Sequence, residues 1–378
     1  MTAPPPTVRL ADGVERRDRD GIVVLAAPAG RSYSELPVRL LPLLDALDGT
    51  RTADELSGRF GPEAVEVITG LRGHGFLADS PPVRVRRVAL TSDGLEVMGA
   101  HRIVRRLTDL LPRRVRVAVG WSALALTGPS LVLAAVHTAG PAPVSALDPL
   151  PAGLVLLAVA FGLIVIHEIA HALVLAHHGR DIGVVGVGLY WGAPCFYVDA
   201  SAVLLLPRRA RIAQAAAGSV ADAVLGGLLV LSTHWFPEPV WVAVGTWGSA
   251  LCLSTVAVNL APVLELDGYW LLCDLLGVRD LFGRSMAALR DVLRRQGVRQ
   301  DRGLALYAVA SLVVGVGFGA AAAWAWWSSA GTVVGALWWH GVGATTIALV
   351  LSVPVAAPLL QPAVALLGRV RSGPRAAR

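Results

Sequence analysis

Apolar residues form long uninterrupted runs from residue 115 onward, whereas the first 80 residues alternate between apolar and charged positions. A run of about 20 apolar residues is long enough to cross a bilayer as a helix. Six runs reach that length, at 116–137, 151–176, 212–234, 240–263, 304–327 and 333–356. The pattern predicts a mainly α protein, a polytopic membrane helix bundle of about six spans.

A further apolar stretch, residues 184–206, is interrupted by glycine and proline and contains valine, tyrosine and phenylalanine. These residue types and interruptions suit strands or a re-entrant segment better than a seventh spanning helix. Non-helical backbone at membrane depth persists only where protein buries it or where it lines a water-filled cavity. We therefore expect a membrane-embedded strand-like segment that lies beside a site.

The N-terminal residues have the pattern of a small α+β domain. Short strands are predicted at 8–10, 14–17, 21–25 and 31–34. An apolar helix is predicted to end at Gly49, and Thr52 with Glu55 forms a capping-box pattern for the next helix. Gly61-Pro62 separates that helix from a third, which is expected to end within residues 73–77.

These patterns divide the chain into three parts. Residues 1–80 form the N-terminal domain, 81–115 a basic linker and 116–370 the six-span membrane domain. Within the linker, residues 96–112 place apolar side chains between arginines. This segment is expected either to lie on the membrane surface or to pack as a connector helix.

The composition agrees with a membrane protein. Hydrophobic residues make up 54% of the 378 residues, charged residues make up 16%, and the mean hydropathy is +0.60. A soluble domain usually carries about 25% charged residues, so the values argue against an ordinary cytosolic globule and a disordered chain. The three cysteines are too few for a disulfide framework.

The positions of the arginines orient the spans, because the chain contains no lysine. Arginines gather before the first, third and fifth spans and after the sixth. The loops 138–150, 235–239 and 328–332 contain none. By the positive-inside rule, we expect a multi-pass protein of the cell membrane with both termini in the cytoplasm and the lipid bilayer as its surroundings.

His167, Glu168 and His171 form the clearest chemical signal, inside the second predicted span. Residues i and i+4 of a helix share a face, so both imidazoles point the same way. The HExxH pattern is typical of zinc hydrolases, in which the glutamate is the general base. Each ionisable group in a span costs about 2.5–3.5 kcal/mol, so three within five residues indicate a metal site rather than core histidines.

A zinc ion needs a third protein ligand. Asp267, at the end of the fourth predicted span, is the first candidate, and the predicted topology places both His171 and Asp267 in the cytoplasmic part of their spans. Glu265 is the alternative, although on a helix it would face elsewhere. Asp199 and Asp222 either line the site or cap local turns.

HExxH followed by the N-x-x-P-x-x-x-L-D-G motif at 259–268 resembles the site-2 protease family of intramembrane zinc metalloproteases, over about residues 150–275. In that family a Gly-Gly pair usually follows the aspartate. Gly268-Tyr269 here is typical of its peptide zinc metalloprotease branch, which the segments FYVDAS (196–201) and AAAGS (215–219) also resemble.

The resemblance implies a role for each motif residue. His167, His171 and Asp267 would bind Zn²⁺, and Glu168 would be the catalytic base. Asn259, the only asparagine of the chain, falls on the motif position thought to help hold the substrate or the oxyanion.

Residues 8–80 resemble the PqqD-like recognition domain of ribosomally made peptide pathways, through LLPLLDALDGTRTADEL (40–56) followed by LRGHGFL (71–77). The resemblance implies a winged-helix-like fold that binds the leader of a precursor peptide along a strand edge. A winged-helix domain with another partner is the alternative. No nucleic-acid partner is expected, because residues 1–80 are nearly balanced in charge.

Together these features predict an intramembrane zinc metalloprotease that cleaves a peptide bond near the cytoplasmic side and matures, or removes the leader of, a ribosomally synthesised modified peptide. One alternative is a regulatory site-2-type protease that releases a membrane-bound regulator. Such enzymes often carry a PDZ-type insertion, for which the loops here are too short. A non-proteolytic peptide export or immunity protein is the other alternative, against which the intact HExxH argues.

Overall fold

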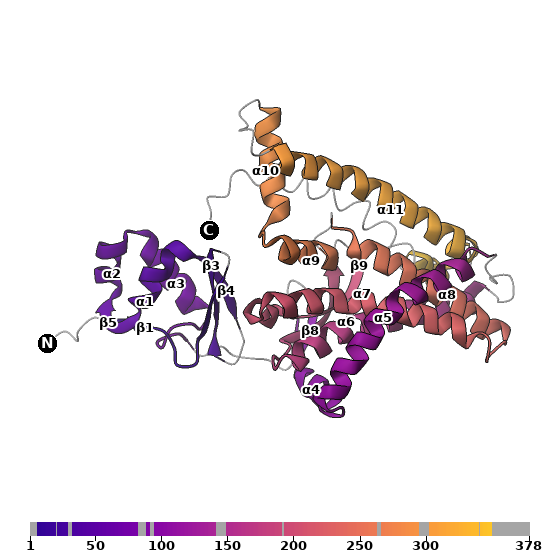
Figure 1. Cartoon of the computed structure of the whole chain (residues 1–378), viewed down its shortest axis with the longest axis horizontal. Coiled ribbons are helices and arrows are strands. Elements are labelled where there is room, and N and C mark those ends of the chain that lie inside the picture. Colours follow the sequence, from indigo (N-terminus) through magenta and orange to yellow (C-terminus); the bar gives the residue numbers. More distant parts are fainter. Residues whose placement is uncertain are drawn as a thin grey trace.

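The computed structural model describes residues 6–19, 21–28, 32–81, 88–90, 94–140, 149–190, 193–262, 266–294, 302–339 and 341–349. The chain is mainly helical, and a small N-terminal domain lies at one end of a group of long packed helices (Figure 1). The predicted division between an N-terminal α+β part and a helical remainder agrees with this arrangement.

Two small sheets and three helices build the N-terminal domain. Its strands are β1 (Thr7–Arg9), β2 (Glu15–Arg19), β3 (Ile22–Ala26), β4 (Tyr33–Pro37) and β5 (Asp48–Thr52), and its helices are α1 (Leu41–Asp45), α2 (Ala53–Phe60) and α3 (Glu63–Gly73). Strand β1 pairs with β5, and the other three form an antiparallel sheet in the order β2-β3-β4. All four predicted strands have counterparts, and the predicted capping box of Thr52 and Glu55 is present.

The predicted helix before Gly49 is shorter than expected. Helix α1 ends at Asp45, because the residues that follow pair with β1 as strand β5. Gly49 lies within that strand with φ of +88°, a backbone conformation that favours glycine.

The central strand β3 is buried on both faces. Val23 and Leu25 pack into the core of the N-terminal domain. Val24 and Ala26 point to the opposite face, where they pack with Leu205 of the membrane part. Since successive side chains of a strand alternate between faces, one face of this sheet forms the domain core and the other docks the domain on the rest of the chain.

Among the described residues, four helices are long and apolar enough to cross a membrane. They are α5 (Arg113–Thr138), α6 (Pro149–His177), α7 (Arg208–Ser232) and α8 (Pro239–Leu260), and they coincide with the first four predicted spans. Helix α7 packs against α5, α6 and α8. The close approach of α7 to α5 requires a small residue at Gly227, where a Cβ would lie 2.7 Å from the Cβ of Ser130.

Three further helices follow: α9 (Asp267–Leu276), α10 (Leu281–Leu293) and α11 (Arg302–Leu337). Asp267 was expected at the end of the fourth span but is the first residue of the separate helix α9, because α8 ends at Leu260. The fifth predicted span lies within α11. Residues 328–332, expected to be a loop, also belong to this helix, because no proline interrupts the chain there. The sixth predicted span, 333–356, begins within α11 and lies partly outside the described residues.

A four-stranded antiparallel sheet lies against α6. It contains β6 (Val88–Leu90), β7 (Gly94–Met98), β8 (Val184–Tyr190) and β9 (Ala193–Val198), in that order. The strands predicted within 184–206 are confirmed. The first two strands come from the segment expected to be a linker, since residues 94–98 pair with 184–188.

Helix α4 (His101–Asp109) follows this sheet in the segment for which two placements were open. It packs on α6 through buried Val104 and Thr108, whereas Ile103 and Leu107 on its other side are exposed. The helix is therefore a packed connector with an apolar, arginine-flanked outer face.

Candidate metal centre

Helix α6 presents both predicted histidine ligands to one buried point. His167 and His171 lie one turn apart, each 6% exposed, with ring centroids 4.8 Å apart. Their Nε2 atoms are 3.2 Å apart. The expectation that the i and i+4 imidazoles share a face is confirmed.

The first residue of α9 completes a triangle of donor atoms. Oδ2 of Asp267 lies 3.1 Å from Nε2 of His167 and 3.2 Å from Nε2 of His171. Ligands bound at 2.0–2.1 Å around a tetrahedral zinc ion are separated by about 3.3 Å. The three atoms are therefore spaced as three ligands of one metal ion, while Glu265 lies outside the described residues.

The triangle faces a glycine of α7. A Cβ on Gly218 would lie 2.4 Å from Nε2 of His167 and 2.6 Å from Nε2 of His171. The space at the donor nitrogens thus exists because this residue has no side chain. Two imidazoles and one carboxylate, with room beside them, suit a divalent ion that keeps a position for water or substrate.

Helix α7 also orients both imidazoles from behind. Nδ1 of His167 lies 2.8 Å from Oδ2 of Asp222, and Nδ1 of His171 lies 2.6 Å from the backbone oxygen of Gln214. Hydrogen bonds of this kind fix the ring orientation and leave Nε2 as the donor atom for a metal. Of the two aspartates left undecided by the sequence, Asp222 is therefore part of the centre, whereas Asp199 accepts hydrogen bonds from Ser201.

A spacing in the sequence marks this part of the site. Gln214, Gly218 and Asp222 follow one another at four-residue intervals, which places them on one face of α7. Two polar residues and a glycine at this spacing in an apolar helix were the available signal, although only Asp222 stood out as a charge in a span. The role of the Gln214 backbone oxygen has no sequence signature.

Asn259 lies beside the same centre. It is the penultimate residue of α8, and its Nδ2 is 3.4 Å from Nε2 of His167. The structure thus brings all five residues singled out by the motifs to one place. The amide is positioned to donate to a group that is bound at the centre.

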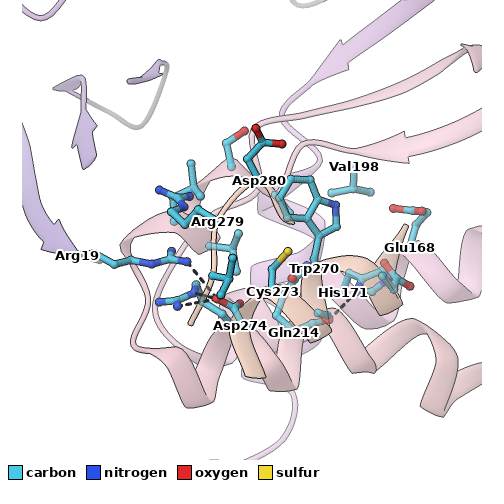
Figure 2. A pocket seen from close by; sticks show the side chains of 18 residues that line it. Arg19, Glu168, His171, Val198, Gln214, Trp270, Cys273, Asp274, Arg279 and Asp280 are labelled. Atoms are coloured by element: carbon cyan, nitrogen blue, oxygen red, sulfur yellow. Dashed lines mark hydrogen bonds and ion pairs between the residues drawn. The ribbon is translucent and has the colours of Figure 1, made fainter. Parts of the chain in front are cut away.

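A cavity of about 450 Å³ opens beside the metal-ligand triangle (Figure 2). Glu168, His171 and Asp267 line one part of it. Trp270 and Val198 of β9 also contribute to its walls. A peptide that enters this cavity would meet the Glu168 carboxylate together with two of the three candidate ligands, His171 and Asp267.

Comparison of the chain with protein-family models, with curated proteins and with solved structures finds no match. What the site can do therefore follows from its own residues. These are two imidazoles and a carboxylate at ligand spacing, a second carboxylate beside them and an amide at the rim.

Proposed function

We propose that the chain is an intramembrane zinc metalloprotease that hydrolyses a peptide bond near the cytoplasmic side of the membrane. The observation that carries the proposal is the triangle of His167, His171 and Asp267 donor atoms, with Glu168 lining the adjoining cavity. Four apolar helices around this centre support its location within a membrane. A relic of such a site would have no need to keep a carboxylate at the position of Glu168.

Each residue then has a chemical task. A zinc ion, when bound, supplies Lewis acidity to water and to the peptide carbonyl. Glu168 accepts a proton from the attacking water and returns it to the leaving amine. The Nδ2 group of Asn259 donates a hydrogen bond to the developing oxyanion. Asp222 holds the ring of His167 while these changes occur.

The outer edge of β9 is the proposed docking place for an extended substrate. The N–H of Asp199 donates to Val184, so alternate residues Val198 and Phe196 direct their N–H groups to the other edge. Within the described sheet, β9 is the last strand. It packs against α6, and Val198 of β9 lines the same cavity as Glu168. A peptide added there would present its carbonyls to the metal centre.

Phe196→Pro is expected to lower cleavage about tenfold, because it removes one outward N–H without breaking the ladder to β8. Phe196→Ala is the matched control, since it removes the ring and keeps the N–H. Cleavage of a peptide substrate by both variants, at equal zinc content, measures the effect. Equal rates for the two variants would show that the substrate does not pair at this residue.

The N-terminal domain is the proposed recognition module for the precursor or its leader peptide. A three-stranded antiparallel sheet followed by three helices supports a PqqD-like, winged-helix-like domain. The arginine distribution supports six spans in the cell membrane with both termini in the cytoplasm. Because the N-terminal domain is proposed to bind a precursor or its leader, the proposed substrate is a ribosomally synthesised modified peptide.

Metal removal tests the proposed function. Any short open reading frame found next to the gene is co-expressed with it as the candidate precursor, and the protein is then purified with its membrane and treated with a chelator. Cleavage should stop as zinc is lost and return when Zn²⁺ is added back, because the zinc ion held by the triangle would be the only Lewis acid in the proposed reaction. Cleavage that continues in metal-free protein would refute a zinc metalloprotease.

A further inference from the structure

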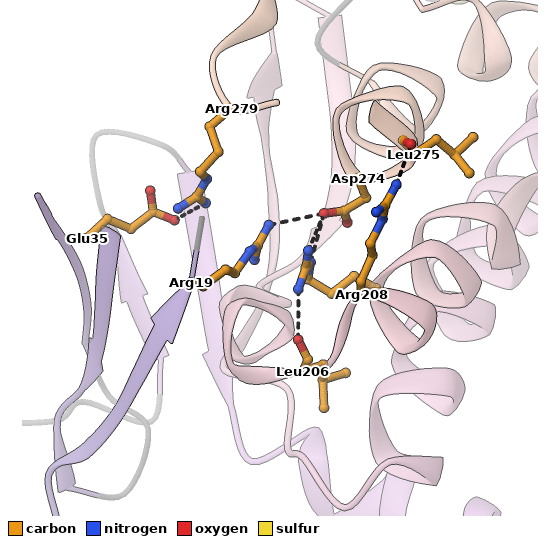
Figure 3. Close-up of polar contacts among 8 residues, drawn as sticks. Arg19, Glu35, Leu206, Arg208, Asp274, Leu275 and Arg279 are labelled. Carbon is orange, nitrogen blue, oxygen red and sulfur yellow. Dashed lines mark hydrogen bonds and ion pairs between the residues drawn. The ribbon is translucent and has the colours of Figure 1, made fainter. Parts of the chain in front are cut away.

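A second cluster of charges ties together the helices that carry the metal centre. Asp274 follows Asp267 by seven residues on α9, which places both on one face about two turns apart. Its Oδ1 accepts hydrogen bonds from Arg211 of α7, at 2.8 Å and 2.6 Å, and from Arg19 of β2 at 3.0 Å (Figure 3). One carboxylate oxygen thus joins α9, α7 and the N-terminal domain.

Helix α7 lies at both ends of the face of α9 that carries Asp267 and Asp274. Arg211, Gly218 and Asp222 are separated by seven and four residues, so they lie on one side of α7. At one end, α7 holds the imidazoles that face Asp267. At the other end, Arg211 holds Asp274. The position of Asp267 therefore depends on how α9 lies against α7.

The ion cluster is largely buried, in the wall of the same cavity that Glu168 and Asp267 line. The side chains of Arg211, Asp274 and Arg19 are 6%, 12% and 12% exposed. Charge-assisted hydrogen bonds in such surroundings are stronger than those at an open surface, and removal of one partner changes the balance for the others. Arg19 is the member of this cluster that comes from outside the membrane part.

Docking of the N-terminal sheet fixes the side chain of Arg19. Arg17 and Arg19 lie on the same face of β2 as the apolar side chains of Val24 and Ala26 on β3. That face packs on Leu205, and Arg17 donates to the backbone oxygen of the same leucine. The interface is buried enough that desolvation raises the pKa of Tyr33 to about 12.

Two further ion pairs hold the domain in this position. Arg279, which follows α9, pairs with Glu35 of β4 (Figure 3). Arg180, which follows α6, pairs with Glu15 of β2 at 2.7 Å. The N-terminal domain is thus attached near the ends of both helices that carry the candidate ligands.

We propose that Arg19 is a positioning residue of the metal centre, acting through Asp274 and α9 on Asp267. The inference rests on the proposed function, because it takes zinc to be the bound metal. With Arg19 in place, α9 is held against α7 so that the Asp267 carboxylate reaches both imidazoles. The N-terminal domain is then a structural part of the metal centre and not a separate module joined to it only by a linker.

Arg19→Ala in the full-length protein tests this inference through metal binding alone. Zinc affinity, measured by competition with a chromogenic chelator, should fall about 2- to 30-fold. The visible spectrum of the protein loaded with Co²⁺ should change, because that spectrum reports the ligand geometry. Arg19→Lys, which keeps a cation near Asp274, should restore most of the affinity.

Arg16→Ala is the matched control. Arg16 lies on the opposite face of β2, where it pairs with Asp18 and Asp45 of its own domain. Zinc affinity and a Co²⁺ spectrum unchanged by Arg19→Ala would overturn the inference. An equal loss of affinity in Arg16→Ala would also overturn it, since the effect would then be general destabilisation.

The outcomes for Arg19 and for the proposed function are distinguishable. Neither metal measurement requires peptide cleavage. A wild-type protein that binds zinc but cleaves no peptide contradicts the protease proposal and leaves the Arg19 test decisive. Metal-dependent cleavage with no effect of Arg19→Ala on zinc affinity contradicts only the inference about Arg19.

Discussion

Glu168→Gln is expected to lower peptide cleavage by about 100- to 10,000-fold while the zinc content stays the same. Glutamine has the size of glutamate but cannot take a proton from water. Glu168 is not a member of the ligand triangle, and it lines the adjoining cavity. The measurement is the cleavage rate of the co-expressed precursor, followed by mass spectrometry, with metal content determined on the same sample.

Glu238→Gln is the matched control for that experiment. Glu238 is the exposed residue that precedes α8, far along that helix from Asn259, so its amide variant should cleave at the wild-type rate. Processing that persists in Glu168→Gln would remove the assignment of this residue as the base. A regulatory protease with another substrate would also lose cleavage in Glu168→Gln. The identity of the cleaved peptide therefore distinguishes a regulatory protease from a peptide-maturing one.

The candidate ligand residues could be recognised in the sequence because ionisable side chains are rare in an apolar helix. His167 and His171 stand out in α6 for that reason, and Asp267 stands out after α8. The supports of these ligands are harder to recognise. Any residue type can supply a backbone oxygen such as that of Gln214, so the sequence does not mark it. Gly218 is one of 40 glycines.

The break between α8 and α9 had a signal in the sequence. Pro262 disfavours helical backbone at Ala261, which is extended in the structure with ψ of 114°. Gly268, the second residue of α9, approaches the end of α8, where a Cβ would lie 2.3 Å from the backbone oxygen of Leu260. The glycine of the L-D-G motif is thus explained by close packing of α9 on α8.

Contacts between distant segments could not be read from local patterns. Strands β6 and β7 are three and five residues long, and β8, which pairs with β7, lies about 90 residues later in the chain. The run IVVLA at 22–26 predicts a strand, and its lack of alternation is typical of a strand buried on both faces. Leu205 covers the second face of this strand. The two segments are far apart in the sequence, so this contact is seen only in the folded chain.

Gly218→Ala is expected to weaken zinc binding about 100-fold, because the added methyl group would occupy the space at both donor nitrogens. Its Cβ would lie 2.4 Å from Nε2 of His167, and the far ends of these rings cannot move away while Asp222 and Gln214 hold their Nδ1 atoms. Gly162→Ala on α6 is the matched control, since no atom lies within 4 Å of a Cβ there. Both variants should keep their helical circular dichroism, and chelator competition measures their affinities. A Gly218→Ala protein that binds zinc as tightly as Gly162→Ala would show that the metal does not lie among these nitrogens.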